Sequence, residues 1–272
     1  TNGKIMSWMV DEYNKLVGVS SIGVLTGKPV EFGGSLGRNE ATGYGVAVTV
    51  RESAKKMGID MTHAKIAVQG FGNVGAFTVK NIQKLGGTVV AVAEWAKEVG
   101  PYAIYKEDGL DFQAMWDYRA EKGNLVDFPG SKMISMDEFW SAQVDVVVPA
   151  ALENSIDAAV AEKIQAKLVC EAANGPTTPE GDEVLNRKGI ILTPDILTNA
   201  GGVTVSYFEW VQNLYGYYWS EAEVEAKEDE AMVKAFEALW AIKEEYGVTM
   251  RESAYMHSVK RVATAMKLRG WY

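Results

Sequence analysis

Short apolar runs that alternate with glycine turns and helical stretches constrain the fold of this chain more than any other feature. Residues 65–69 form such a run, which is followed by a turn with three glycines and by a helical pattern that reaches about Leu85. Further apolar runs follow at 88–93, 144–148, 168–171 and 190–193. Continuous apolar strands separated by helices are typical of a parallel sheet that is covered on both faces. The pattern therefore predicts an α/β fold.

The turn after the first run has the spacing G-x-G-x-x-G, and its residues are Gly70, Phe71, Gly72, Asn73, Val74 and Gly75. It follows an expected strand and opens an expected helix, which is the context of a dinucleotide-binding turn. The first glycine allows the tight turn, the second lets the backbone approach a pyrophosphate, and the third lets helix and strand pack closely. Free amides and the dipole at the helix start then hold the phosphates. We predict a Rossmann-like, doubly wound, mostly parallel sheet that binds a dinucleotide.

Glu94 ends the second apolar run, nineteen residues after Gly75. A carboxylate at this place accepts hydrogen bonds from the hydroxyls of the adenosine ribose and repels a 2′-phosphate. This favours NAD over NADP as the cofactor. Lys97 is close enough in sequence to weaken the argument, and a surface glutamate at a strand end is the simpler alternative.

Helices are expected on either side of this core. Residues 4–16 and 42–57 have apolar side chains at helical spacing, and the chain after residue 200 has a helical pattern throughout. Ser220 is expected to be a helix N-cap, and the acidic stretch 221–230 is expected to be a solvated helix face. Because no repeat or low-complexity linker occurs, we expect residues 1–272 to form one domain, with a core at about 40–200 and flanking helices at 1–39 and 201–272.

Charge and cysteine content argue against several classes of protein. The 272 residues carry a formal net charge of −9, which would repel a polyanion, so no nucleic-acid partner is expected. No apolar run approaches the roughly 18 residues that span a bilayer, and nothing near Thr1 resembles a signal peptide, so no membrane partner is expected. Cys170 is the only cysteine and fits a core position in a cytoplasmic, reducing compartment. His63 and His257 lie far apart without cysteine neighbours, so no metal site is expected.

Several segments besides the glycine turn carry a recognisable pattern. They are 26–29, 33–35 and 38–45 near the start, 149–151 with Asn154, 171–176, and 199–203 with 206–210. With the turn, they resemble the second, nucleotide-binding half of bacterial hexameric glutamate dehydrogenases over essentially the whole chain. In an open parallel sheet, ligands bind outside the carboxyl ends of the strands. Gly70, Glu94, Pro149 and Asn174 each follow or end an expected strand, so they can converge there. The resemblance implies oxidative deamination of L-glutamate to 2-oxoglutarate and ammonia by hydride transfer to NAD in the intact enzyme.

The resemblance implies roles for residues on the cofactor side of the cleft. Arg38 and Thr42 would lie beside the nicotinamide end, with the Thr42 hydroxyl able to bond the carboxamide. Asn73 and Val74 would line the pyrophosphate turn, and Glu94 would face the adenosine ribose.

It also implies contacts nearer to the substrate. Ala150, Ala151 and Asn174 would border the nicotinamide ribose, and Asn199 would contact the nicotinamide side. Ser206 would reach the side-chain carboxylate of the substrate, which separates glutamate dehydrogenases from similar enzymes for leucine, valine and phenylalanine. On its chemistry alone, Ser206 could equally bond the backbone of its own helix.

The catalytic groups that the resemblance implies are not in this sequence. Such enzymes use a lysine in a glycine-rich segment and an aspartate, but no Gly-Gly-Lys-Gly segment occurs, and the aspartate would precede Thr1. Hydride transfer needs its partners held at about 3–3.5 Å, with acid–base assistance. We therefore expect a module that binds NAD(H) without turning over glutamate, whose partner is a missing substrate-binding domain. By itself it would be a monomer or weak dimer, and the intact enzyme would be a homohexamer.

Two other hypotheses stay open. The chain could be a complete small dehydrogenase, for which Lys28 and Asp195 are the nearest acid–base candidates, or a non-catalytic NAD sensor with a protein ligand. A domain separated from its partner should expose apolar residues where the two would meet. The candidates lie on the terminal helices, and they are Met6, Trp8, Met9, Trp271 and Tyr272.

Overall fold

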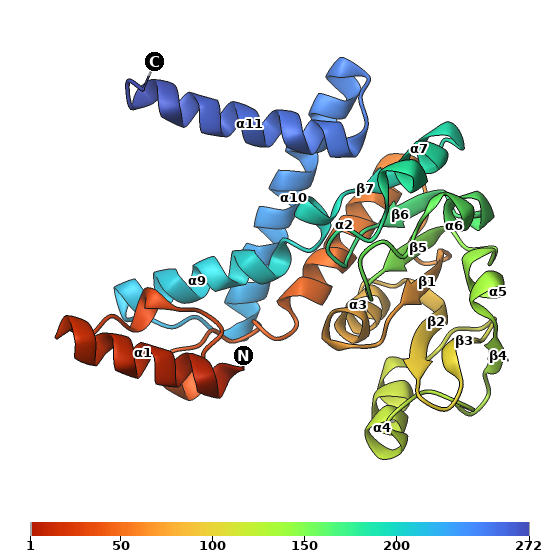
Figure 1. Cartoon of the computed structure of the whole chain (residues 1–272), viewed down its shortest axis with the longest axis horizontal. Coiled ribbons are helices and arrows are strands. Elements are labelled where there is room, and N and C mark those ends of the chain that lie inside the picture. The colour runs from red at the N-terminus through yellow and green to blue at the C-terminus, as the bar shows by residue number, and fades with distance from the viewer. Residues whose placement is uncertain (1, 272) are drawn as a thin grey trace.

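The computed structural model describes residues 2–271, which contain a seven-stranded sheet with helices on both faces (Figure 1). The strand order is β4-β3-β2-β1-β5-β6-β7. The parallel strands are β1 (Lys65–Gln69), β2 (Thr88–Ala96), β5 (Val146–Pro149), β6 (Leu168–Cys170) and β7 (Ile191–Thr193). Two antiparallel strands, β3 (Gly100–Tyr105) and β4 (Lys132–Ile134), extend the sheet beyond β2. The predicted doubly wound, mostly parallel sheet is confirmed, and β3 and β4 are additions to it.

Alternate side chains of the central strand β1 enter two separate apolar layers. Ile66 and Val68 are buried in the layer that also receives α2 (Ala41–Met57), α3 (Asn73–Lys84) and α4 (Phe112–Lys122). Ala67 points to the opposite layer, which α5 (Met136–Trp140), α6 (Ala158–Lys163) and α7 (Pro179–Arg187) cover. A sheet covered on both faces explains why its strands are continuously apolar in sequence.

Helix α2 lies between the sheet and the C-terminal helices, and two of its glycines allow close packing on both flanks. A Cβ at Gly43 would come within 2.5 Å of the Phe77 carbonyl carbon in α3. A Cβ at Gly45 would come within 2.9 Å of the Gly201 Cα, where α9 (Gly201–Tyr215) begins. Either contact excludes any larger residue, so α2 holds the two parts of the molecule directly against each other.

The remaining helices follow the predicted pattern with sharper ends. Helix α1 (Gly3–Val17) and the short turns Ile22–Val24 and Val30–Phe32 precede α2, and α8 (Asp195–Thr198) precedes α9. Helix α10 (Glu221–Tyr246) has Ser220 as its N-cap, as predicted, with a reciprocal capping box between Ser220 and Glu223. Helix α11 (Met250–Leu268) is buried only near its start, and its far end projects from the body (Figure 1).

The terminal helices expose apolar side chains, as the sequence predicts. Trp8 is 60% exposed, Met9 47% and Trp271 62%, while Met6 is half-buried. Tyr272 lies outside the described residues. Between residues 2 and 271, no helix combines the length and the apolar character needed to cross a membrane.

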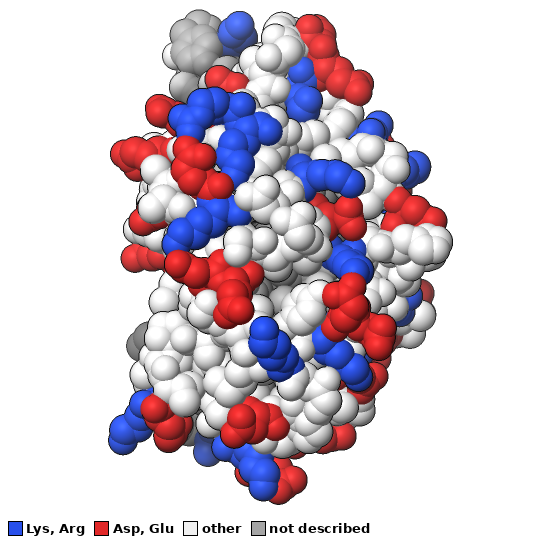
Figure 2. Space-filling model, turned by 90° about the vertical axis from the view of Figure 1, so that its right-hand side faces the viewer, with Lys and Arg blue, Asp and Glu red and all other residues white. Residues whose placement is uncertain are grey.

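Charged side chains of both signs are interspersed on the face of the molecule where α5, α6 and β4 lie (Figure 2). The prediction that residues 221–230 form a solvated acidic face is wrong at Glu228, which is only 2% exposed. Glu228 lies four residues after Val224 and four before Met232, both buried, and this spacing places it on the inward face of α10. Asp229 is not free in solvent either, because its Oδ2 forms an ion pair with Arg51 Nη1 at 2.8 Å.

Candidate functional site

A cleft of about 770 Å³ lies outside the carboxyl ends of β5 and β6. Eight of the predicted site residues line it, and these are Arg38, Thr42, Val74, Ala150, Ala151, Asn174, Asn199 and Ser206. Sequence reasoning did not single out the other lining residues, which are Thr26, Leu152, Glu153, Ala172, Ala173, Gly202 and Val203. Most of these others belong to the segments that carry the family pattern, so the pattern was the signal that could have found them.

The glycine turn borders this cleft where the chain switches between the two halves of the sheet. The Gly70 N–H donates to the Ala93 carbonyl at 2.6 Å, which ties the turn to β2. Gly70 has φ +97°, and a Cβ there would come within 2.9 Å of the Ala150 oxygen, beyond β5. A Cβ at Gly75 would come within 2.0 Å of the Gly70 oxygen. Ligands of open α/β sheets bind at such a switch point.

The start of α3 leaves room for an anion. A Cβ at Gly72 would meet nothing within 4 Å, and Gly72 provides no side-chain acceptor as the N-cap. The first-turn amides of α3 are therefore available to a ligand, and the helix dipole favours a negative one. The Asn73 side chain donates to the Asn39 carbonyl at 3.2 Å. Phe71 is fully buried, with its ring 6.3 Å from that of Phe112, so only its main chain can serve the turn.

Hydrogen bonds organise the polar side chains on the opposite wall. The Asn199 amide nitrogen donates to the Asn174 side-chain oxygen at 2.8 Å, and also to the Ala172 carbonyl at 3.2 Å. Arg38 Nε donates to the Ser206 hydroxyl oxygen at 2.8 Å. That hydroxyl donates in turn to the Gly202 carbonyl at 3.0 Å, so Ser206 bonds its own helix and also faces the cleft.

Glu94 lies outside the cleft lining, on the β2 side of the glycine turn. Its carboxylate is 2.6 Å from Arg119 Nε, and the Tyr102 hydroxyl donates to it at 3.3 Å. Burial raises the pKa of Glu94, and the Arg119 guanidinium opposes that rise. Arg119 comes from α4, 25 residues later, and no local sequence signal connects the two. A group already paired with a cation repels a phosphate less than a free carboxylate does.

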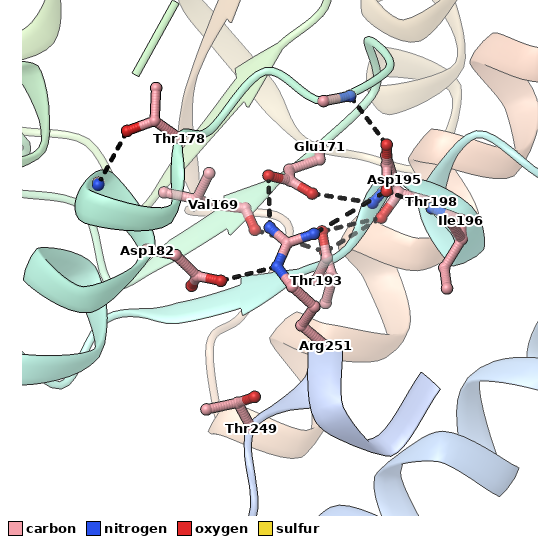
Figure 3. A network of polar contacts seen from close by, with 12 residues as sticks. Val169, Glu171, Thr178, Asp182, Thr193, Asp195, Ile196, Thr198, Thr249 and Arg251 are labelled. Carbon is pink, nitrogen blue, oxygen red and sulfur yellow. Dashed lines mark hydrogen bonds and ion pairs between the residues drawn. The ribbon is translucent and has the colours of Figure 1, made fainter. Parts of the chain in front are cut away.

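The two acid–base candidates of the complete-enzyme hypothesis have structural partners. Lys28 Nζ is 2.6 Å from Glu209 Oε1, and both side chains are fully buried. Asp195 accepts from the Gly175 and Ile196 amides, each at 2.8 Å (Figure 3). Neither residue lines the cleft, where Arg38 and Glu153 are the ionisable side chains among the described residues.

Cys170 and His63 have ordinary environments. Cys170 is fully buried, and burial raises the pKa of its thiol to about 12, which confirms a core position. His63 Nδ1 lies 2.9 Å from Asp60 on the surface. Over residues 2–271, no three or more His, Cys, Asp or Glu side chains gather as metal ligands would.

Comparison with known proteins assigns the chain to a family. Residues 33–270 match the model of glutamate/leucine/phenylalanine/valine dehydrogenases. The chain belongs to this dehydrogenase family. It is 76% identical to an NAD-specific glutamate dehydrogenase of Clostridioides difficile and 62% identical to one of Peptoniphilus asaccharolyticus. All of this chain matches in both alignments, but it spans only 65% of either relative.

Solved structures of the dehydrogenase family share the fold. A glutamate dehydrogenase of Peptoniphilus asaccharolyticus superposes with a TM-score of 0.90 at 59% identity, over the full chain and 64% of the solved one. A hetero-hexameric glutamate dehydrogenase from Thermus thermophilus also gives 0.90, at 33% identity, over the full chain and 63% of the solved one.

Proposed function

We propose that this chain is the NAD(H)-binding part of an NAD-specific glutamate dehydrogenase. The observation that carries the proposal is the meeting of the glycine turn, the loop after β5 and the loop after β6 at one cleft, in a chain of the dehydrogenase family. The two relatives whose names specify NAD and glutamate support the choice within that family.

The residues present fit a dinucleotide. Open space above Gly72, together with unclaimed amides at the start of α3, forms a cradle that a Cβ would partly fill. In the proposed complex the turn 70–75 holds the pyrophosphate, and Glu94 faces the adenosine ribose. Ala150, Ala151 and Asn174 border the nicotinamide ribose. When bound, the nicotinamide ring accepts or releases the hydride.

The nicotinamide end and the substrate are proposed to share the remaining cleft residues. Thr42 and Asn199 contact the nicotinamide side, with Arg38 beside them. Ser206 and Arg38, joined at 2.8 Å, make this end of the cleft polar. A guanidinium and a hydroxyl suit a substrate carboxylate, which supports glutamate over an amino acid with an apolar side chain.

We propose that the chain binds cofactor without turnover. The two ionisable side chains that line the described cleft are the guanidinium of Arg38 and the exposed carboxylate of Glu153, so neither the lysine nor the aspartate that the chemistry needs lines it. Its partner is then a substrate-binding domain that supplies the catalytic lysine and aspartate, in a homohexamer when intact. The chain alone would be a monomer or weak dimer, and its buried free thiol suits the cytoplasm.

Gly72→Ala tests the cofactor site, because the protein itself has room for the added methyl group. We expect NADH to bind the unaltered chain in a fluorescence titration and Gly72→Ala to weaken binding more than tenfold. The melting temperature should change little, since φ is −73° at Gly72 and nothing lies within 4 Å. A chain that binds no NADH, or a variant that binds it equally well, would refute the proposal.

A steady-state assay tests the absence of turnover. The pure chain is mixed with 2-oxoglutarate, ammonium and NADH, and the absorbance of NADH is followed. We expect no consumption above a control without protein. Clear turnover would establish a complete enzyme instead.

A further inference from the structure

One guanidinium connects three carboxylates that come from separate elements. Arg251, the second residue of α11, donates from Nε to Asp182 of α7 at 2.7 Å and from Nη2 to Glu171 at 2.8 Å (Figure 3). Its Nη1 lies 3.9 Å from Asp195 in α8. The Glu171 side chain is fully buried, and the others are less than a quarter exposed. Figure 3 shows the guanidinium between β6, α7 and α8, at the base of α11.

From this cluster a chain of hydrogen bonds leads to the cleft. The second oxygen of Glu171 accepts from the Asp195 N–H at 2.9 Å. Asp195 Oδ2 accepts from the Gly175 N–H at 2.8 Å. Gly175 directly follows Asn174, whose side-chain oxygen accepts from Asn199. Both asparagines line the cleft, whereas Arg251 does not.

We propose that Arg251 is a positioning residue, which holds the Asn174–Gly175 loop in its binding conformation through Glu171 and Asp195. The inference rests on the proposed function, because it assigns Arg251 a role in presenting the nicotinamide-ribose side of that same site. It also means that the base of α11 and this loop share one network, so the seating of α11 affects half of the cofactor site.

The reason lies in the position of Glu171. A buried carboxylate that loses its cation takes up a proton or turns away, and in either case it changes as an acceptor. Asp195 would then lose the acceptor that fixes its N–H. Its own carboxylate, which accepts from the Gly175 N–H, would lose its fixed position as well. The glycine turn at the start of α3 is outside this network and should keep its geometry.

Arg251→Met, with Arg251→Lys for comparison, separates positioning from general stability. We expect Arg251→Met to weaken NADH binding roughly tenfold, the effect of losing one or two ordered hydrogen bonds. Binding of ADP, which lacks the nicotinamide half, should stay within about twofold of the unaltered chain. Arg251→Lys should recover part of the NADH affinity. The matched control is Arg187→Met, which removes an exposed ion pair between α7 and Glu162. It should leave the affinity for both NADH and ADP unchanged.

Asp195→Ala cuts the same connection at a second point and keeps the inference testable if Arg251→Met folds poorly. It should weaken NADH binding selectively as well, and the double variant should lose little more than either single one. Two results would overturn the positioning role. One is an equal loss of affinity for NADH and for ADP, and the other is a double variant whose loss of NADH affinity equals the sum of the two single losses. An unaltered chain that binds neither ligand would overturn the proposed function, and this inference with it.

Hydrogen exchange gives a readout that needs no ligand. In Arg251→Met the amides of residues 172–175 should exchange faster than in the unaltered chain, because the Gly175 N–H loses its fixed acceptor. Amides of residues 70–76 should exchange at an unchanged rate. Unchanged exchange at 172–175 in a folded variant would contradict the inference independently of any binding result.

Discussion

The buried ion pair between Lys28 and Glu209 gives the most demanding test of the packing described above. Glu209 of α9 holds the ammonium at 2.6 Å and accepts from two main-chain amides, Gly27 at 2.8 Å and Lys28 at 3.3 Å. The same ammonium donates to the Leu25 carbonyl at 2.6 Å. The pair thus fixes residues 25–28 against α9, next to Thr26 in the cleft.

Glu209→Gln should be strongly destabilising because it leaves the Lys28 ammonium buried without a counter-charge. Breaking one partner of a buried pair costs about 3–5 kcal/mol, and here both side chains are fully buried, so the full range applies. For a chain of this size, such a loss lowers the melting temperature by roughly 6–20 °C. The loss is measured by urea unfolding followed through tryptophan fluorescence, with the slope checked for constancy.

The double variant Lys28→Met/Glu209→Gln distinguishes charge from lost packing. It should be more stable than Glu209→Gln alone by about 1–3 kcal/mol, because no charge stays buried and the glutamine oxygen can still accept from the Gly27 amide. As a surface comparison, Lys56→Gln breaks a partly exposed pair with Glu237 and should cost less than about 1 kcal/mol. A cost for Glu209→Gln as small as that of Lys56→Gln would refute the reasoning.

Three further outcomes follow from other positions. Gly75→Ala should destabilise the fold by about 2 kcal/mol or more, measured by the urea midpoint, since its Cβ would come within 2.0 Å of the Gly70 oxygen; a wild-type midpoint would show the turn to be adaptable. Glu94→Ser should improve NADPH binding relative to NADH by roughly tenfold in paired titrations, because it frees Arg119 for a 2′-phosphate, and an unchanged ratio would remove Glu94 from the site. Burial, reinforced by Glu225 and Asp229 and opposed by Arg38, raises the pKa of Glu228 to about 8, so the folded chain keeps a proton that the unfolded chain releases near pH 4.5. Stability should therefore fall from pH 5 to 8, and Glu228→Gln should flatten that fall by an amount on the order of 3 kcal/mol; parallel pH profiles of the two proteins would contradict this.

The fold was predictable where local sequence determines it and was missed where distant residues do. The strand at 65–69 and the N-cap at Ser220 match the structure because apolar runs, glycine turns and capping residues act over a few positions. The strand pairs β2–β3 and β3–β4 were missed, since Gly100–Tyr105 forms a strand by pairing along its whole length with Ala91–Ala96. The short sequences of β3 and β4 contain no local pattern that predicts a strand.

The candidate site shows the same division. The glycine spacing and the family pattern located the turn and most of the cleft, but not the partners of its side chains. Arg119, Glu209 and Arg251 reach Glu94, Lys28 and Glu171 across separations of 25, 181 and 80 residues. The inward position of Glu228, in contrast, could have been predicted from the sequence. Helical periodicity places it on the same stripe as Val224 and Met232.

The two glycines of α2 affect how cooperatively the molecule unfolds. Gly43 and Gly45 bring the backbones of α3 and α9 so near to one helix that neither flank can slide or tilt without a steric clash. Because the sheet and the C-terminal helices both pack closely against α2, we expect that neither part unfolds while the other stays folded. Heating should accordingly give a single calorimetric peak, in which the strands and the C-terminal helices are lost together.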